Sequence, residues 1–253
     1  MIEVKGLYKR FHDKEVLNGV DLSIEEGKIT TIIGQSGCGK SVLLKHIVGL
    51  HRPDKGTVTI DDVSLADMDD DALRACRTQF SYLFQGGALF DSLSVWENVV
   101  FPLVWAGGHH HHYEKDMLQE KARQTLELVG MHHVENMKPS ELSGGMKKRA
   151  ALARAIVHNP RYILYDEPTT GLDPVMSAVI DDLIRRLNTE LGLTSVVVTH
   201  DMQSVSHVSD QVCMLYDGRI VFKGSVPEMN QNSNPILKQF IKRKNKGPIL
   251  FGR

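Results

Sequence analysis

The sequence predicts an α/β fold with a mostly parallel central sheet. Apolar, β-branched runs at residues 29–33, 162–165 and 195–199 are typical of buried strands. Residues 41–50 and 176–191 lie between these runs and have the pattern of helices. Strands and helices in this alternation favour a sheet of mostly parallel strands.

The other expected elements are short strands and one helical block. Strands and turns are expected over residues 4–27, with further strands at 57–60 and 82–84. From about residue 91 to 158 the pattern becomes helical, most clearly at 115–129. We interpret this stretch as a helical subdomain inserted into the α/β core.

Composition limits the class of protein. The 253 residues, 42% of them hydrophobic, allow a sizeable core in one or two domains, and a net charge of -1 gives no reason to expect a nucleic-acid partner. No apolar run approaches the ~18–20 residues that span a bilayer, and no signal peptide is visible. Cys38, Cys76 and Cys213 are widely spaced, which suits a reducing cytosol. We therefore expect a cytosolic chain whose membrane role depends on a partner.

A glycine-rich loop follows the first buried strand and opens a helix. It matches the pattern G-x-x-x-x-G-K-[ST] at Gly34, Gln35, Ser36, Gly37, Cys38, Gly39, Lys40 and Ser41. Glycines let successive backbone N–H groups point into one concavity, and the helix adds its positive N-terminal end. Lys40 is expected to reach the outer phosphates and Ser41 to ligate Mg²⁺. Because the strand and helix are in place, we predict an ATP site rather than a chance turn.

An acidic pair and a histidine end two other buried strands. Asp166 and Glu167 follow the run at 162–165, and His200 follows the run at 195–199. Ligands of open α/β sheets lie outside the carboxyl ends of the strands. Asp166 is expected to hold Mg²⁺, Glu167 to polarise the attacking water, and His200 to bond a γ-phosphate oxygen. Solvated loop acids and a structural histidine are the alternatives, which the shared topology makes less favourable.

A second anion site is expected where Leu142, Ser143, Gly144, Gly145 and Met146 precede a predicted helix at 147–157. A serine and two glycines leave backbone N–H groups free at the start of that helix. One phosphate group does not need two such sites from one chain. We therefore expect a dimer in which the second site of one chain closes over the nucleotide of the other.

The order of these motifs resembles the ATPase subunit of ABC (ATP-binding cassette) transporters over about residues 2–224. The motifs are the loop 34–41, Gln85, residues 142–146, the acidic pair, Gly171-Leu172-Asp173 and His200. The resemblance implies a P-loop NTPase fold with an antiparallel β subdomain and an inserted helical subdomain. It also implies ATP hydrolysis coupled to transport, with ATP and Mg²⁺ as ligands.

The resemblance also implies roles for single residues. Phe11 resembles the aromatic residue that stacks on adenine, with Tyr8 as the second choice. Gln85 resembles the glutamine that contacts Mg²⁺ and relays the nucleotide state to the membrane subunit, and Asp173 resembles the aspartate that crosses the dimer interface. The signature usually ends in glutamine, and Met146 departs from it. That departure concerns communication through this position rather than the sandwiching of ATP.

Residues 84–99 and 142–155 and the tail resemble the ATPases of MCE-type lipid transporters, which include the Mla phospholipid systems. This implies an integral membrane permease and an MCE-domain lipid-binding protein as partners, on the cytoplasmic side of the inner membrane. It implies a homodimer that powers phospholipid transport for outer-membrane lipid asymmetry. A groove near Gln85 and residues 90–96 is expected to receive a cytoplasmic helix of the permease.

We predict an ATPase domain at 1–229 and a tail at 230–253 that docks on the partner. The apolar anchors of the tail are Phe240 and residues 249–251. Contact with anionic lipid, worth ~1 kcal/mol per basic residue, is the alternative. The basic residues of the tail are Lys238, Lys242, Arg243, Lys244, Lys246 and Arg253.

Other interpretations remain at this point. The function could be that of another ABC importer or exporter, or of an ABC ATPase that moves no solute, although no long coiled coil or second cassette is visible. A nucleotide sensor without hydrolysis and a P-loop kinase are less favoured, because of the acidic pair and the signature.

We interpret His109–His112 as a solvated loop rather than a metal site. Cys38 lies beside a helix N-terminus, where the pKa of a thiol tends to fall, so alkylation is expected to block ATP binding and Mg-ATP to protect. An inert small residue between the glycines is the alternative.

Overall fold

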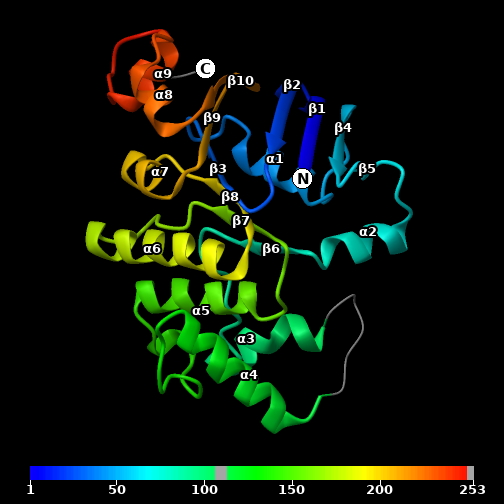
Figure 1. The fold of residues 1–253 in the computed structure, drawn as a ribbon, viewed down its shortest axis with the longest axis vertical. Coiled ribbons are helices and arrows are strands. Elements are labelled where there is room, and N and C mark those ends of the chain that lie inside the picture. Colours follow the sequence, from blue (N-terminus) through cyan, green and yellow to red (C-terminus); the bar gives the residue numbers. More distant parts are fainter. Residues whose placement is uncertain (106–112, 250–253) are drawn as a thin grey trace. The chain divides into compact units, whose positions relative to one another are not determined.

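The computed structural model describes residues 1–105 and 113–249, and it divides into two compact units (Figure 1). The first unit comprises Met1–Met68 and Val196–Arg253, and the second comprises Asp69–Ser195. The histidine run at 109–112, Leu250, Phe251 and Arg253 lie outside the described residues.

The first unit contains an antiparallel sheet in the order β2-β1-β4-β5. Its strands are β1 (Ile2–Phe11), β2 (Lys14–Ile24), β4 (Lys55–Ile60) and β5 (Val63–Ser64). Alternate side chains of β1 and β2 are buried, as expected for a sheet with one face on a core. The expectation of short strands over residues 4–27 was wrong in length, since β1 and β2 have 10 and 11 residues.

The first unit also contains strands in the order β10-β9-β3-β8. The buried strand β3 (Ile29–Ile33) runs parallel to β9 (Gln211–Tyr216), and β10 (Arg219–Gly224) returns antiparallel to β9. Helix α1 (Lys40–Ile47) follows β3, and α7 (Met202–Val208) follows β8 (Thr194–Val198). The strand at 29–33 matches its prediction, whereas β9 and β10 had not been predicted.

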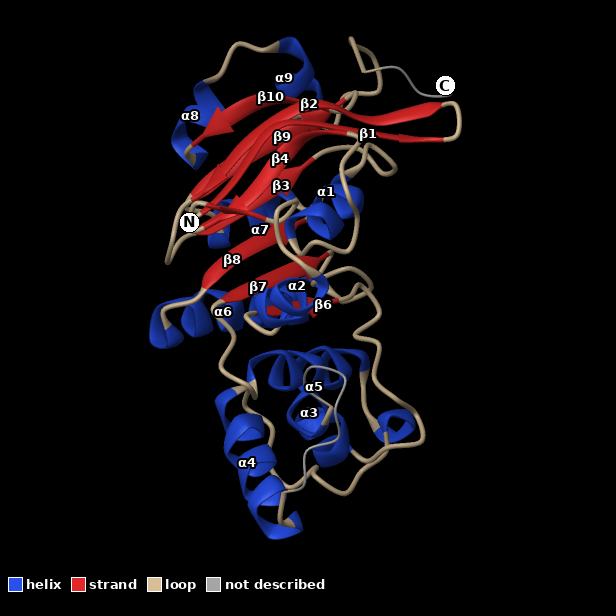
Figure 2. Ribbon diagram, turned by 90° about the vertical axis from the view of Figure 1, so that its right-hand side faces the viewer, coloured by secondary structure: helices blue, strands red, loops and turns tan. Residues whose placement is uncertain are grey.

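The second unit has parallel strands and a group of helices (Figure 2). Strands β6 (Phe80–Leu83) and β7 (Tyr162–Asp166) are parallel, and β7 lies between β6 and the start of β8, where the two units divide. The helices are α2 (Asp70–Arg77), α3 (Val95–Val104), α4 (Lys115–Leu128), the 3-10 turn η2 (Pro139–Glu141), α5 (Gly144–Ile156) and α6 (Pro174–Leu191). Helices α3, α4 and α5 pack together and form the helical block expected at 91–158.

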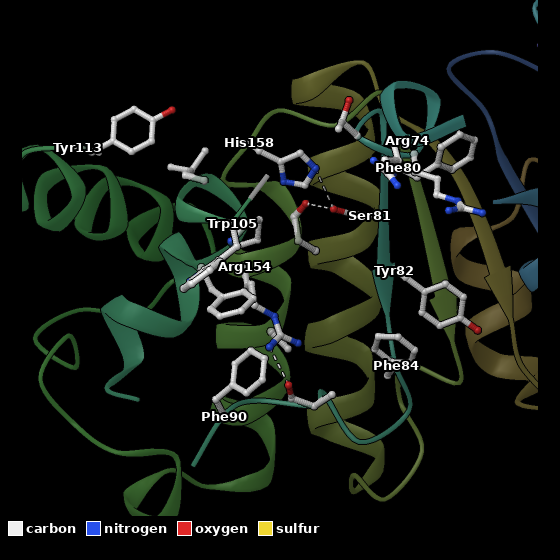
Figure 3. Close-up of a pocket in the computed structure, with 18 residues that line it drawn as sticks. Arg74, Phe80, Ser81, Tyr82, Phe84, Phe90, Trp105, Tyr113, Arg154 and His158 are labelled. Atoms are coloured by element: carbon white, nitrogen blue, oxygen red, sulfur yellow. Dashed lines mark hydrogen bonds between the residues drawn. The ribbon is translucent and has the colours of Figure 1, made fainter. Parts of the chain in front are cut away.

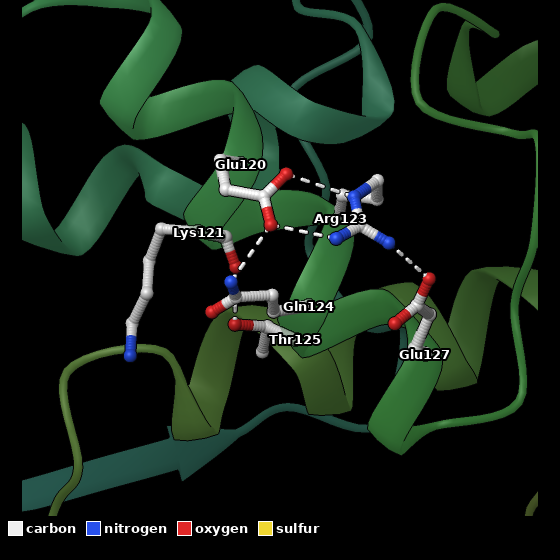
Figure 4. Close-up of polar contacts among 6 residues, drawn as sticks. All are labelled: Glu120, Lys121, Arg123, Gln124, Thr125 and Glu127. Carbon is white, nitrogen blue, oxygen red and sulfur yellow. Dashed lines mark hydrogen bonds and ion pairs between the residues drawn. The ribbon is translucent and has the colours of Figure 1, made fainter.

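The outer face of α4 is held by ion pairs of Arg123, whose side chain bonds both Glu120 and Glu127 (Figure 4). The inner face buries Leu118 and Leu126. The guanidinium of Arg123 and the amide of Gln124 lower the pKa of Glu120 to about 2. Because all three charged groups face solvent, the packing of the inner face holds this helix more than the ion pairs do.

The C-terminal residues fold onto the first unit rather than forming a free tail. Helices α8 (Val226–Gln231) and α9 (Pro235–Ile241) follow β10. Leu237 and Ile249 are buried in a cluster that includes Ile33, Val212 and Met214. The backbone N–H of Ile249 donates to Oε1 of Gln239 at 2.7 Å, and Nε2 of Gln239 donates to the carbonyl of Ile249 at 3.3 Å. As an anchor for a partner, Ile249 is therefore unavailable in this structure, because its own chain covers it.

No helix within 1–105 or 113–249 is long and apolar enough to cross a membrane.

Candidate active site

The glycine-rich loop lies in the first unit, between β3 and α1. Gly37 and Gly39 have φ of +77° and +105°, which favour glycine strongly. A Cβ on Gly34 would lie 2.3 Å from the carbonyl oxygen of Leu215. The loop is therefore shaped by backbone conformations and close approaches that larger residues would disturb.

Lys40 points its ammonium group back into this loop. Nζ donates to the carbonyl oxygens of Gly34 and Gln35, both at 2.9 Å, and the side chain is 7% exposed. A buried cation that donates to neutral carbonyls is well suited to receive anionic oxygens, since charge-assisted hydrogen bonds are stronger. This position fits the predicted contact with outer phosphates.

Cys38 departs from the expectation for its thiol. Burial raises its pKa above the usual value, and this outweighs the opposite effect of the Lys40 charge. The predicted fall in pKa was wrong because the half-buried thiolate loses more hydration than the helix start and the lysine return. The thiol is therefore less ionised at neutral pH than a free cysteine.

Phe11 ends β1 and exposes 37% of its surface. Its ring meets that of His51 edge to face at 5.6 Å, and the Lys9 ammonium lies 5.5 Å from the ring centre. The ring of Tyr8 lies over Gly19 instead, so close that a Cβ there would be 2.9 Å from the Tyr8 hydroxyl. Phe11 therefore offers the more accessible surface for stacking on a base.

His200 occupies the turn between the buried strand β8 and α7. Its imidazole is exposed, and the next residue, Asp201, caps α7 by accepting from the N–H of Gln203 at 3.0 Å. The N–H of Asp201 also donates to the Thr199 hydroxyl at 3.0 Å. These bonds fix the backbone on which His200 stands at the carboxyl end of the strand, as predicted.

Asp166 and Glu167 belong to the second unit, at the end of β7. The Tyr82 hydroxyl donates to Oδ2 of Asp166 at 2.8 Å. Glu167 has φ of +52°, a left-handed conformation that strains a residue other than glycine. The Thr170 hydroxyl donates to its carboxylate at 3.1 Å. Backbone strain at a residue that follows a buried strand fits a functional role for the Glu167 side chain.

A buried lysine connects Gln85 with Glu167. Lys148, on α5, is 6% exposed and donates to the carbonyl of Gln85, with a longer contact of 3.5 Å to the carbonyl of Glu167. Burial lowers the pKa of Lys148, and the charge of Glu167 opposes this. Lys148, Tyr82 and Thr170 were not predicted from the sequence. The available signal for Lys148 was a lysine on the apolar side of an alanine-rich helix.

The predicted signature begins α5. Ser143 is its N-cap, and the hydroxyl accepts from the N–H of Met146 at 3.3 Å. A Cβ on Gly145 would lie 2.4 Å from the terminal methyl of Met176, so this glycine allows α6 to pack closely. Leu142 is buried, whereas Gly144 is exposed. The exposed helix start fits an anion site.

Asp173 is the N-cap of α6. Its carboxylate accepts from the N–H groups of Val175 and Met176 at 2.9 and 3.0 Å. The predicted place of Asp173 in a dimer interface stays a prediction.

The donor set proposed for Mg²⁺ consists of the Ser41 hydroxyl, the Gln85 amide and the Asp166 carboxylate. These oxygen donors suit a hard cation, and the orientation of Asp166 by Tyr82 fits a metal ligand with an outer partner. Ser41 belongs to the first unit, and Gln85 and Asp166 belong to the second. Among the described residues, no cluster of three or more His, Cys, Asp or Glu is placed to hold a metal ion.

A large groove opens in the second unit (Figure 3). Its volume is about 1270 Å³. Nη1 and Nη2 of Arg154 donate to the carbonyls of Ala88 and Gly87 at 2.7 and 2.6 Å, and the guanidinium lies 5.9 Å from the Phe90 ring centre. Its lining includes the aromatic side chains of Phe80, Tyr82, Phe84, Phe90, Phe101, Trp105 and Tyr113. Of the stretch predicted to receive a partner helix, Phe90 lines the groove, together with Phe84 and Ala88 on either side of Gln85, and the docking role stays a prediction.

The chain matches the ABC transporter family over residues 17–170. With this match and the loop, acidic pair and signature in place, the chain belongs to the ABC transporter family and is an ATPase of that type. The family, fold and ATPase activity predicted from the sequence are confirmed, whereas the roles of single residues stay predictions.

The chain is similar to ATP-binding proteins of transport systems and to a solved dimeric ATP-binding cassette. The intermembrane phospholipid transport system ATP-binding protein MlaF of Haemophilus influenzae is 38% identical, over 99% of this chain and 94% of that protein. The probable ribonucleotide transport ATP-binding protein mkl of Mycobacterium leprae is 38% identical, over 98% of this chain and 70% of that protein. The dimeric post-hydrolysis structure of the ATP-binding cassette MJ0796, bound to ADP and Pi, has a TM-score of 0.80 and 34% identity, covering 89% and 99% of the two chains.

Proposed function

We propose that two copies of this chain bind two ATP molecules between them and drive phospholipid transport through an integral membrane permease. The proposal that the cargo is a phospholipid rests on the 38% identity to a phospholipid transport ATP-binding protein over 99% of the chain. The likeness to a dimeric cassette bound to ADP and Pi supports the homodimer.

ATP is held in this proposal by one chain and closed in by the other. The loop N–H groups and Lys40 bind the phosphates, and Phe11 stacks on the adenine. The exposed N-terminus of α5 in the second copy, at residues 142–146, closes over the outer phosphates. Asp173 crosses between the copies. Binding closes the dimer, and release of products reopens it.

Each polar side chain of the site has one role in the proposed hydrolysis. Glu167 accepts the proton of the water that attacks the γ-phosphorus, and ADP and phosphate leave. Lys40 offsets charge on the outer phosphate, and His200 donates to a γ-phosphate oxygen. Ser41, Gln85 and Asp166 hold Mg²⁺, which supplies further positive charge against the phosphate oxygens.

The groove is proposed to receive a cytoplasmic helix of the permease. Its aromatic lining suits the apolar face of an amphipathic helix, and Arg74 and Arg77 at its lining suit an acidic side chain on that helix. This docking places the chain peripherally on the cytoplasmic side of the inner membrane. An MCE-domain lipid-binding protein completes the proposed complex, and the basic residues beyond Asn230 contribute to docking.

The catalytic assignment is tested with Glu167→Gln. Removing the proton acceptor should lower kcat by roughly 10²–10⁴-fold while ATP binding persists. The variant should then accumulate as an ATP-bound dimer, measured by light scattering with and without ATP. Wild-type turnover in Glu167→Gln would remove Glu167 as the base.

The cargo is tested in the complex purified with its membrane partners. In liposomes, ATP should drive movement of a fluorescent phospholipid, and the Glu167→Gln complex should not. The similarity to mkl favours a ribonucleotide as the second candidate. ATP-dependent uptake of a labelled ribonucleotide without lipid movement would replace the lipid proposal while leaving the ATPase assignment intact.

A further inference from the structure

Tyr82 belongs both to the groove and to the surroundings of Asp166. Its ring lines the groove beside Phe84, with ring centres 4.4 Å apart (Figure 3). Its hydroxyl donates to Oδ2 of Asp166 at 2.8 Å. One half-buried side chain therefore contacts the proposed docking surface with its ring and a proposed metal ligand with its hydroxyl.

The parallel register of β6 and β7 produces this contact. Tyr82 pairs with Leu164, and Asp166 lies two residues further along β7. Residues i and i+2 of a strand share a face, so Asp166 stands on the side of Leu164 and one step toward the carboxyl end. The side chain of Tyr82 is long enough to span that step. Its neighbours in β6, Ser81 and Leu83, are buried.

The Tyr82 hydroxyl faces the Asp166 carboxylate directly, at 2.8 Å from Oδ2. A neutral hydroxyl facing a carboxylate forms a charge-assisted hydrogen bond, which is geometrically demanding and strong. Oδ2 of Asp166 is therefore directed by a partner, and the carboxylate plane is restrained.

We propose that Tyr82 is a positioning residue that orients the Asp166 carboxylate for Mg²⁺-ATP and links that orientation to the occupant of the groove. This rests on the proposed function, in which Asp166 holds Mg²⁺. Outer partners of metal ligands fix ligand orientation, and their loss typically costs ~10–100-fold in metal affinity or activity. A helix seated in the groove would press on the Tyr82 ring and so reach Asp166 through one side chain.

Tyr82→Phe tests the positioning, because it keeps the ring and removes only the donor. Mg²⁺ is titrated at fixed ATP in the full chain, by ATP hydrolysis and, separately, by binding of a non-hydrolysable ATP analogue. The Mg²⁺ concentration at half-maximum should rise ~10-fold in both titrations. Analogue binding without Mg²⁺ and the melting temperature should stay near wild type. Wild-type Mg²⁺ dependence in Tyr82→Phe would overturn the proposal.

Tyr216→Phe is the matched control, since it removes a tyrosine hydroxyl that donates to the carbonyl of Pro248 at 3.4 Å in the first unit. It should leave the Mg²⁺ titrations unchanged. The groove link is tested by comparing the free chain with the complex purified with its membrane partners. The Mg²⁺ half-maximum should differ between the two in wild type, and Tyr82→Phe should lose that difference. No difference in wild type, or equal differences in both, contradicts the link.

Asp166→Asn separates failure of this inference from failure of the proposed function. If Asp166→Asn keeps wild-type Mg²⁺ dependence, Asp166 does not hold the ion and the proposed site fails. If Asp166→Asn loses Mg²⁺-dependent binding while Tyr82→Phe is unchanged, only the role of Tyr82 fails.

Discussion

The phosphate loop of the first unit and the groove of the second are built in opposite ways. The loop is made from consecutive residues whose backbone turns around Lys40, so its chemistry is local. The groove is lined by side chains from α2, β6, α3 and α5. The hydrogen bond between Tyr82 and Asp166 joins residues that are 84 positions apart in the chain. A local site is sensitive to single substitutions at fixed positions, whereas an assembled site depends on the packing that brings its parts together.

Lys40→Met should have the largest effect and tests the local side of this contrast. It removes the one ammonium group seen inside the loop, so ATP binding and hydrolysis should both fall, hydrolysis by about 10³-fold. Phosphate release and fluorescent-ATP binding measure this. Lys45→Met, on the same helix, is the control and should stay near wild type. More than a tenth of wild-type turnover in Lys40→Met would contradict the assignment.

Arg154→Met should have an intermediate effect, and it tests the groove, which is assembled from segments distant in the chain. It leaves the carbonyls of Gly87 and Ala88 without their donor and should lower the free energy of unfolding by about 1–3 kcal/mol. Urea denaturation measures this change. Binding to the permease complex should weaken as well, because these carbonyls shape the groove.

Lys147→Met controls for the loss of a cation from the same helix and should stay within about 0.5 kcal/mol of wild type. If Arg154→Met is as stable as this control and binds the complex normally, the arginine does not organise the groove.

The smallest expected change is in the alkylation rate of Cys38, which reports how deeply the loop buries this thiol. Because burial raises the pKa of its thiol, less thiolate is present at pH 7 than in free cysteine. Iodoacetamide should therefore react several-fold more slowly than with glutathione, and the rate should keep rising above pH 9. Mg-ATP should protect, and complete modification should block ATP binding. Cys38→Ser distinguishes this thiol from Cys76 and Cys213, and full activity after modification would contradict the prediction.

The sequence predicted most of what is local and little of what is assembled. The loop could be recognised because its glycines, lysine and serine are adjacent, and β7 because its apolar run ends in acids. Tyr82 could not be identified, since its partner is far along the chain. The sign of the Cys38 pKa shift depends on burial, which spacing does not show. Ile249 was expected to anchor the tail on a partner, whereas in the structure it packs with Leu237 into a cluster of its own chain, a long-range contact that the tail sequence does not show.

The division of the chain also has a consequence for its synthesis. The second unit, Asp69–Ser195, is one continuous stretch, so all its parts have been made before the ribosome reaches Val196. The first unit joins Met1–Met68 with Val196–Arg253, and Ile33 meets Ile249 in one cluster. At about 5–20 residues per second, β3 waits roughly ten seconds or more for β9 and the last helix to emerge. The strands beside β3 are therefore completed after the helical unit has had time to fold.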